Sequence, residues 1–435
     1  MAPNSWRGPA PLASDNGVAP QWWAAFRDPI LTDLVERALR NNDDIAIAVG
    51  RVAEARADFR ISRAQLLPNI GLSGGGFRDR DVNPAFGAPE YQTGGEAEVA
   101  ISYDLDLFGH LKDSSAAARS QLLATEAAKD NVRLAVASST ASGYITLCAL
   151  DARLVVLSAT VAAREEELRI ARRQAQDGYS SQLDLAQADA AYQAARQLIP
   201  ATELAITKEE DGLSVLLGEN PQAIARGASL DQLVVPSVPV SLPSSLLRRR
   251  PDIITAEQKL AASDHALDSA RDAFMPDIQL SASGGFAAST LAVANPLAIW
   301  MLGGSILAPL FTAGRLEGEQ DAATARRDQA AFAYRKTALA AFDEVEDALA
   351  AVQRDGEQEQ VLISQRDAFD RAFKLASNRY SAGYSPYLDQ IDAQRELLSA
   401  QLALVQARAD RLTAAVQLYQ SLGGGWTALN PPKER

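Results

Sequence analysis

Apolar and polar residues alternate from Glu96 to Leu107, with Ala100 as the one apolar residue on the otherwise polar side. The odd-numbered positions are all apolar, whereas four of the even-numbered positions are carboxylates, at Glu96, Glu98, Asp104 and Asp106. A period of two predicts a β-strand with two different faces, and this one is about twice as long as the usual five or six residues. Such a strand is typical of a protein that spans an outer membrane, with lipid against the apolar face and water against the polar one.

Three further segments are expected to pair with this strand: Asn69–Phe77, Asp277–Phe286 and Ala298–Phe311. Trp300, near the start of the last segment, is placed to anchor at the lipid–water interface. The alternative for all four is a soluble sheet with many exposed edges. In lipid, four strands cannot close a barrel, and an open edge leaves backbone groups without hydrogen bonds. Three chains, giving about twelve strands, are the smallest sensible closure, because membrane barrels begin at about eight strands.

Long helices are predicted next to the strands. The segment from Lys112 to Asp177 contains no proline and only one glycine, Gly143. At about 1.5 Å per residue, it would form a helix approaching ~100 Å in length. A second helix is expected to return from Leu183 to Leu217, with a kink or weakened hydrogen bonding at Pro200.

Helices are also predicted for two other segments. The chain from Leu31 to Leu67 lies between Pro29 and Pro68 and is predicted as a helix. Near the C-terminal end, apolar residues recur with a period of about 3.5 residues, which indicates left-handed supercoiling against neighbouring helices. The positions are Leu398, Leu402, Val405, Ala409, Leu412, Val416 and Tyr419.

Four short motifs occur twice, in the same order and about 205 residues apart. They are Leu66–Ser73 and Phe274–Ser281, Asp106–Gly109 and Pro309–Gly314, Gly178–Ser180 and Gly383–Ser385, and Leu217–Gly218 and Leu422–Gly423. The order predicts two copies of one plan: a helix, a strand pair and two long helices. We therefore expect an N-terminal tether (1–21), a first repeat (22–220), a linker (221–242), a second repeat (243–426) and a C-terminal tail (427–435).

Composition narrows the function. The net charge is −13 and the pI is about 4.8, which argues against a nucleic-acid partner because little would neutralise the phosphates. With one cysteine (Cys148) and two histidines, the chain offers no disulfide and no evident metal or catalytic site. The glycine-rich stretch Gly71–Gly76 lacks the spacing of a phosphate loop. We expect no catalytic residues and no cofactor.

No signal peptide or clean membrane helix is recognisable. The chain begins without a basic and apolar leader, which fits either a cytoplasmic protein or a mature chain whose export signal has been removed. The uncharged stretch Ile278–Gly314 is long enough to span a membrane but is interrupted by glycines and prolines, so we expect strands and a loop there.

Asp389 and Asp392 are the most suggestive carboxylates. They lie three residues apart, just after the turn that contains Gly383 and Pro386, and would share one face of a helix start. The simpler interpretation is that they stabilise the helix N-terminus through its dipole. In a trimer, the same face would gather six carboxylates around one axis, raise their pKa values and form a cation-selective constriction.

Together, these residues resemble a known family, the NodT-type efflux lipoproteins among the TolC-like outer membrane factors. The resemblance covers Trp22 to Trp426. It rests on the two Gly-Tyr-Ser turns and on further motifs along the chain. These are Trp23, Phe26, Asp28-Pro29, Leu31, Leu34, Ala38-Leu39, Asn41-Asn42, Pro68, Leu105–Gly109, Leu388–Arg395 and Leu422–Trp426.

The resemblance implies a mainly α homotrimer with a twelve-stranded membrane β-barrel, a long periplasmic α-helical barrel and an equatorial belt. It implies an exit duct in the outer membrane lipid, reaching into the periplasm, that serves a periplasmic adaptor and an inner-membrane RND-type transporter. The adaptor would contact Gly178, Tyr179, Ser180, Gly383, Tyr384 and Ser385. Asp389 and Asp392 would form an acidic gate, and bonds at Tyr380 and Asp184 would help to keep it shut.

Two departures from the family pattern bear on this expectation. Ser385 stands where TolC has an arginine, so a salt bridge from Asp184 at that point is missing. The lipid-bearing N-terminal cysteine of NodT-type proteins is also missing, and we expect that it was lost with the export signal. A soluble periplasmic coiled-coil scaffold, a duct for type I secretion and an enzyme on a helical frame are the alternatives.

Overall fold

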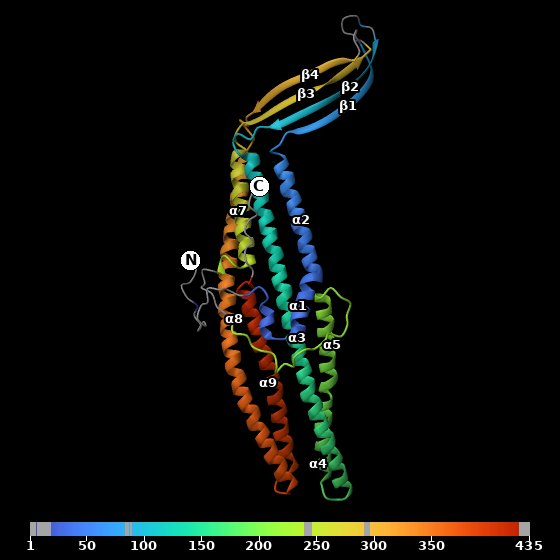
Figure 1. Cartoon of the computed structure of the whole chain (residues 1–435), viewed down its shortest axis with the longest axis vertical. Helices are drawn as coiled ribbons and strands as arrows, with labels where there is room; N and C mark the ends of the chain where they lie inside the picture. The colour runs from blue at the N-terminus through green and yellow to red at the C-terminus, as the bar shows by residue number, and fades with distance from the viewer. Residues whose placement is uncertain are drawn as a thin grey trace. The chain divides into compact units, whose positions relative to one another are not determined.

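The computed structural model describes residues 6, 19–82, 87, 89–238, 246–290 and 296–425. Most of the predicted tether (1–5 and 7–18), the end of the linker with the first residues of the second repeat (239–245), Trp426 and the predicted C-terminal tail lie outside the described residues. Within them, the plan of a helix, a strand pair, a long helix and a returning helix occurs twice, as the predicted internal repeat requires, although the returning helix is divided in the first copy (Figure 1). The elements are η1 (Trp22–Phe26), α1 (Pro29–Asn41), α2 (Asp43–Ala64), β1 (Asn69–Val82), β2 (Pro89–Asp104), α3 (His110–Gln176), α4 (Gln182–Arg196), α5 (Leu198–Leu216), α7 (Pro251–Asp272), β3 (Asp277–Ser289), β4 (Leu297–Leu307), α8 (Arg315–Ser381) and α9 (Tyr387–Ser421).

Corresponding helices in the two repeats have equal lengths. α2 and α7 each contain 22 residues, and α3 and α8 each contain 67. The 67-residue helices would extend roughly 100 Å, as the sequence predicts. Glycines with positive φ end the helices at matching places, for example Gly218 (φ 68°) and Gly423 (φ 89°). The two repeats are therefore alike in backbone structure as well as in their sequence motifs.

The strands form one antiparallel sheet in the order β1-β2-β3-β4 (Figure 1). Residues directly opposite each other in an antiparallel sheet share a face. Ile101 lies opposite Ile70 and Ala282, and its neighbour Ser102 lies opposite Asn69 and Ser281. The register thus extends the alternation of β2 across the neighbouring strands. One face carries Ile70, Leu72, Val99, Ile101, Phe286, Trp300 and Leu302, all of them exposed in the single chain.

The strand bounds differ from the predicted ones. β1 continues to Val82 rather than Phe77, because the charged residues after Phe77 still pair with β2. β2 begins at Pro89 rather than Glu96, for the same reason, and ends at Asp104. β4 ends at Leu307 rather than Phe311, just before Ala308-Pro309, where proline cannot donate to a ladder.

Two of the predicted helices are each divided in two. The helix expected over Leu31–Leu67 breaks at Asn42, whose ψ is 131°. The Asn42 side chain accepts hydrogen bonds from the amides of Asp44 (3.0 Å) and Ile45 (3.2 Å), so it caps α2. The helix expected over Leu183–Leu217 divides at Gln197, three residues before Pro200. The backbone of Gln197 stays helical (φ −62°, ψ −21°), so only the hydrogen bonding is relaxed there, as expected where a proline ring follows and obstructs the preceding turn.

The chain packs into two compact units, and each draws on both repeats. The first unit contains residues 1–49, 128–254 and 337–435, and the second contains 50–127 and 255–336. In the first, Trp22 is 1% exposed and stacks on Tyr419, with ring centroids 5.1 Å apart. An 18-residue stretch of α3 has a mean hydropathy of 1.8 and could cross a membrane by length and composition alone. No membrane helix was expected there, and α3 also supplies Tyr144, Ile145 and Leu147 to the core of the first unit.

Candidate functional site at the helical turns

The two Gly-Tyr-Ser turns have the same backbone geometry. Gly178 and Gly383 both have φ of 76°, and a Cβ atom built on either glycine would meet nothing within 4 Å. Backbone conformation rather than space therefore favours glycine here. The amide of Tyr179 donates to the carbonyl of Gln174 (2.7 Å), and that of Tyr384 donates to the carbonyl of Arg379 (2.8 Å). Both turns leave a tyrosine on the surface, since Tyr179 is 86% exposed and Tyr384 is 78% exposed.

The carboxylate of Asp184 belongs to a capping box at the start of α4. The Asp184 amide donates to Ser181 Oγ (3.1 Å), and the Ser181 amide donates to Asp184 Oδ2 (3.3 Å). This arrangement satisfies backbone donors that a helix start leaves unpaired. The hydrogen bonds of Asp184 thus fix the first turn of α4, a role that the sequence did not predict for it.

Asp389 and Asp392 lie at the start of α9, where the sequence analysis placed them. Asp389 is exposed. Asp392 forms an ion pair with Arg395 one turn later, in which both side chains are about half exposed or more (49% and 65%). An ion pair this exposed contributes little to stability. Neither carboxylate is held inside the single chain, so both are accessible to solvent or to another subunit.

Behind the turns, a small apolar cluster joins three helices. Its buried members are Leu168 and Ala171 of α3, Ala188 of α4 and Tyr387 of α9. Tyr380 of α8 packs against this cluster, and its ring centroid lies 5.1 Å from that of Tyr387. Burial, and then the charge of Asp184, raises the pKa of Tyr380. The charge of Asp184 at the start of α4 thus acts on the ring of Tyr380 in α8.

Next to the cluster lies a polar network, here called the Glu167 network, formed by Arg164, Glu167, Gln390 and Gln394. Glu167 accepts hydrogen bonds from the side-chain amides of Gln390 (3.1 Å) and Gln394 (3.2 Å). Arg164, which is 5% exposed, donates to Gln394 Oε1 (3.3 Å) and to the carbonyl of Ala191 in α4 (2.7 Å). Burial raises the pKa of Glu167. The network links α3, α4 and α9.

Sequence reasoning missed this network because its members are more than 220 residues apart (|i−j| of 223 and 227 for the two glutamine bonds). The one available signal was spacing: Arg164 and Glu167 lie three apart on α3, and Gln390 and Gln394 lie four apart on α9. Within the described residues, four buried oxygens nearby have no hydrogen-bond partner: Ser180 Oγ, Ser385 Oγ, Tyr387 Oη and Gln390 Oε1. Polar atoms left unpaired in a protein interior weaken the packing around them.

The described residues contain no group of three or more His, Cys, Asp or Glu side chains arranged to hold a metal ion. The features on which a comparison can rest are a two-faced sheet, long helices and exposed turns. Comparison with known proteins decides which family this architecture represents. The chain matches the family described as outer membrane efflux protein at residues 34–219 and 242–424. The chain belongs to the outer membrane efflux protein family.

Relatives and solved structures within this family agree with the fold. The toluene efflux pump outer membrane protein TtgC of Pseudomonas putida is 35% identical over 426 residues, which cover 95% of this chain and 87% of the relative. The pyoverdine export outer membrane protein OpmQ of Pseudomonas aeruginosa is 34% identical over 435 residues (98% and 91%). The outer-membrane channel OprN has a TM-score of 0.91 at 25% identity (98% and 97%). The open MtrE channel of Neisseria gonorrhoeae has 0.87 at 27% (98% and 98%).

This efflux protein is accordingly an outer-membrane channel of TolC-like fold that extends into the periplasm. It is the trimeric exit component of a tripartite efflux pump. Trimerisation gives hydrogen-bonding partners to the two edge strands of the sheet, β1 and β4, because lipid offers no hydrogen bonds to an open edge. The soluble scaffold and the type I secretion duct find no support in these comparisons.

Proposed function

We propose that this efflux duct is closed at its periplasmic end by the residues around the helical turns, and opens when a partner complex docks there. The partners are a periplasmic adaptor and an inner-membrane RND-type transporter. The observation that supports this most directly is the matching geometry of the two turns, with Tyr179 and Tyr384 exposed at corresponding places. Three subunits would present six such tips, formed by Gly178–Ser180 and Gly383–Ser385, to the adaptor.

Asp389 and Asp392 are the proposed gate carboxylates. Their solvent exposure and their position beside the turn suit an acidic ring around the trimer axis. Carboxylates gathered in this way attract cations and make a constriction cation-selective. Tyr380 and Asp184 would support the closed state from behind the ring, through the apolar cluster and the capped start of α4.

TolC has an arginine where this chain has Ser385. The Glu167 network would supply contacts in place of that arginine. It holds α9 against α3 through three side-chain hydrogen bonds, and α3 against α4 through one bond to a backbone carbonyl. We propose that opening moves α9 away from α3 and breaks the bonds between Glu167 and the two glutamines. The unpaired oxygens around the turns would make this region easier to rearrange than a fully satisfied interface.

Single-channel recording tests the gate. In the double variant Asp389→Ala and Asp392→Ala, block of the current by divalent cations from the periplasmic side should weaken at least tenfold, because the charges that attract the cations are gone. Asp367→Ala with Asp370→Ala is the matched control, since these carboxylates are also three apart, near the surface of α8. Unchanged block in the first variant, or equal weakening in both, would contradict the assignment.

A further inference from the structure

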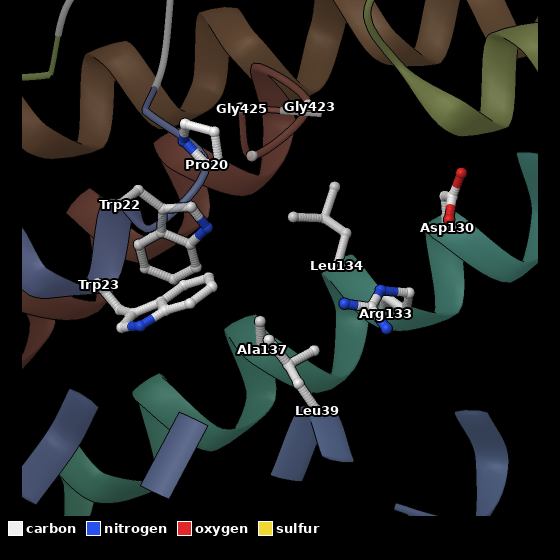
Figure 2. A pocket seen from close by; sticks show the side chains of 11 residues that line it. Pro20, Trp22, Trp23, Leu39, Asp130, Arg133, Leu134, Ala137, Gly423 and Gly425 are labelled. Atoms are coloured by element: carbon white, nitrogen blue, oxygen red, sulfur yellow. The ribbon is translucent and has the colours of Figure 1, made fainter. Parts of the chain in front are cut away.

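The first unit contains a cavity of about 300 Å³ that the duct function does not use (Figure 2). Its walls are the rings of Trp22 and Trp23, the side chains of Leu39, Leu134 and Ala137, and the glycine turn that follows α9. Arg133 lies about 31 residues before Arg164 on α3, so the cavity is roughly 45 Å along the helix from the Glu167 network. A cavity of this size falls within the range of small-molecule sites.

Gly424 explains why the cavity stays open on the side of the glycine turn. Its φ is 59°, and a Cβ atom there would lie 2.2 Å from Leu134 Cδ1 and 3.5 Å from Trp22 Nε1. A side chain at this position would therefore displace the wall or fill the space. The positive φ of Gly423 and Gly425 turns the backbone around this point.

Two hydrogen-bond donors face the cavity without a recorded protein partner. Figure 2 shows the Trp22 ring nitrogen and the Arg133 guanidinium turned toward the same space. Trp22 is 1% exposed whereas Arg133 is exposed to solvent, and among the described residues neither the Trp22 N–H nor the Arg133 guanidinium forms a hydrogen bond or ion pair. Asp130, on the rim, is 12% exposed and paired with Lys129 (3.3 Å). The charge that remains available to a ligand is therefore the positive charge of Arg133.

From these groups, we infer that the cavity binds a small aromatic carboxylate. The indole rings and aliphatic side chains would cover a flat apolar body. The Arg133 guanidinium and the Trp22 N–H both donate hydrogen bonds, so they would bind only a group that provides lone pairs. A carboxylate matches the guanidinium best. A neutral aromatic molecule would gain the apolar contacts but leave the arginine without its counter-charge.

Fluorine NMR on the detergent-solubilised full-length protein tests this site, with 4-(trifluoromethyl)benzoate as the probe and 4-(trifluoromethyl)benzamide as its uncharged counterpart. The benzoate should bind about tenfold more tightly than the benzamide, because its bond to arginine is charge-assisted. In Arg133→Gln, the affinity for benzoate should fall about tenfold, to that of the benzamide. Arg40→Gln is the matched control: it removes the same charge beside Leu39, from a residue that does not line the cavity.

A variant that fills the space separates this cavity from other apolar surfaces. Ala137→Leu should abolish binding of both probes, since the added carbons would occupy the cavity. If this variant does not fold, the comparison between Arg133→Gln and Arg40→Gln still decides. The inference is overturned if wild-type protein does not bind the benzoate, if acid and amide bind equally, or if Arg133→Gln leaves the benzoate affinity unchanged.

Discussion

The carboxylate of Asp28 is 1% exposed and accepts four hydrogen bonds from three parts of the chain. Oδ1 accepts from the amides of Ile30 (2.7 Å) and Leu31 (3.2 Å) and caps α1. Oδ2 accepts from the Tyr144 hydroxyl (2.8 Å) and the Ala228 amide (2.8 Å). One side chain thus ties the start of α1 to the middle of α3 and to the linker between the repeats.

Asp28→Asn should lower stability by about 3 kcal/mol. The side-chain NH2 of the asparagine is itself a donor, and it would face donors that now bond to a carboxylate oxygen. The matched control is Asp33→Asn in α1, whose carboxylate is 56% exposed and 3.5 Å from Arg37. That variant should change stability by less than about 0.5 kcal/mol. Thermal unfolding of the detergent-solubilised trimer, followed by circular dichroism, measures both. Similar losses in the two variants would show that Asp28 is not the link described here.

Glu167 should make the stability of the helical turns depend on pH. Burial raises its pKa, so the folded protein favours the protonated carboxyl. The stability contributed by this group is present at acid pH and is lost as the pH rises through the raised pKa. Relative to Glu167→Gln, the wild-type melting temperature should therefore fall as the pH rises above the ordinary pKa of a glutamate, about 4.3, and through the raised value. Glu167→Ala should cost about 2 kcal/mol, since it leaves two amide donors without an acceptor.

Glu166 offers a control on the same helix turn. It is exposed, and its hydrogen bond from Arg169 lowers its pKa, so its effect on stability has the opposite sign. Glu166→Gln should therefore not reproduce the pH dependence of Glu167→Gln. A wild-type melting temperature that falls in parallel with that of Glu167→Gln over this pH range would refute the role given to Glu167.

At the scale of the element, the two turns depend on a backbone conformation that only glycine adopts easily. Gly178→Ala and Gly383→Ala should each cost about 1 kcal/mol through the positive φ alone, because neither Cβ would meet another atom. The same substitution at Gly212, inside α5 and equally free of neighbours, should stabilise by up to about 1 kcal/mol. Melting temperatures compare the three variants.

The turn variants also test the proposed contact with the adaptor. Copurification of the adaptor should decrease for Gly178→Ala and Gly383→Ala, because the exposed tyrosines that follow them would change direction. It should be unchanged for Gly212→Ala. If all three variants retain the adaptor equally while the melting temperatures change as expected, the turns are structural and the adaptor binds elsewhere.

The elements show which features a sequence can predict. Long proline-free segments, glycine turns and the alternation of β2 are local, so the pattern of α3, β2 and the repeat is visible in the residues themselves. Asn42 divides a helix with its own side chain, although the flanking residues fit one continuous helix. The charged end of β1 does not alternate, and only its pairing with β2 makes it a strand.

The candidate site was predictable to a similar extent. The turns and the position of Asp389 and Asp392 follow from local motifs and from the resemblance. The Glu167 network does not, because its bonds join α3 to α9 across more than half of the chain. The donors at the cavity, Trp22 and Arg133, likewise meet only after η1, α3 and the turn that follows α9 have packed together.

At the scale of the whole molecule, the sheet must present one face to lipid and the other to water. Ile101 and Ser102 are adjacent in β2 but lie in rows of opposite character: Ile101 is paired with Ile70 and Ala282, and Ser102 with Asn69 and Ser281. Ile101→Lys should therefore cost about 2–4 kcal/mol if its row faces the middle of the bilayer, while Ser102→Lys should be tolerated in a water-filled lumen. The amount of folded trimer recovered from the outer-membrane fraction measures the difference. Equal recovery of both variants would mean that the two faces of the sheet do not meet different solvents, and the membrane-spanning barrel would then have to be abandoned.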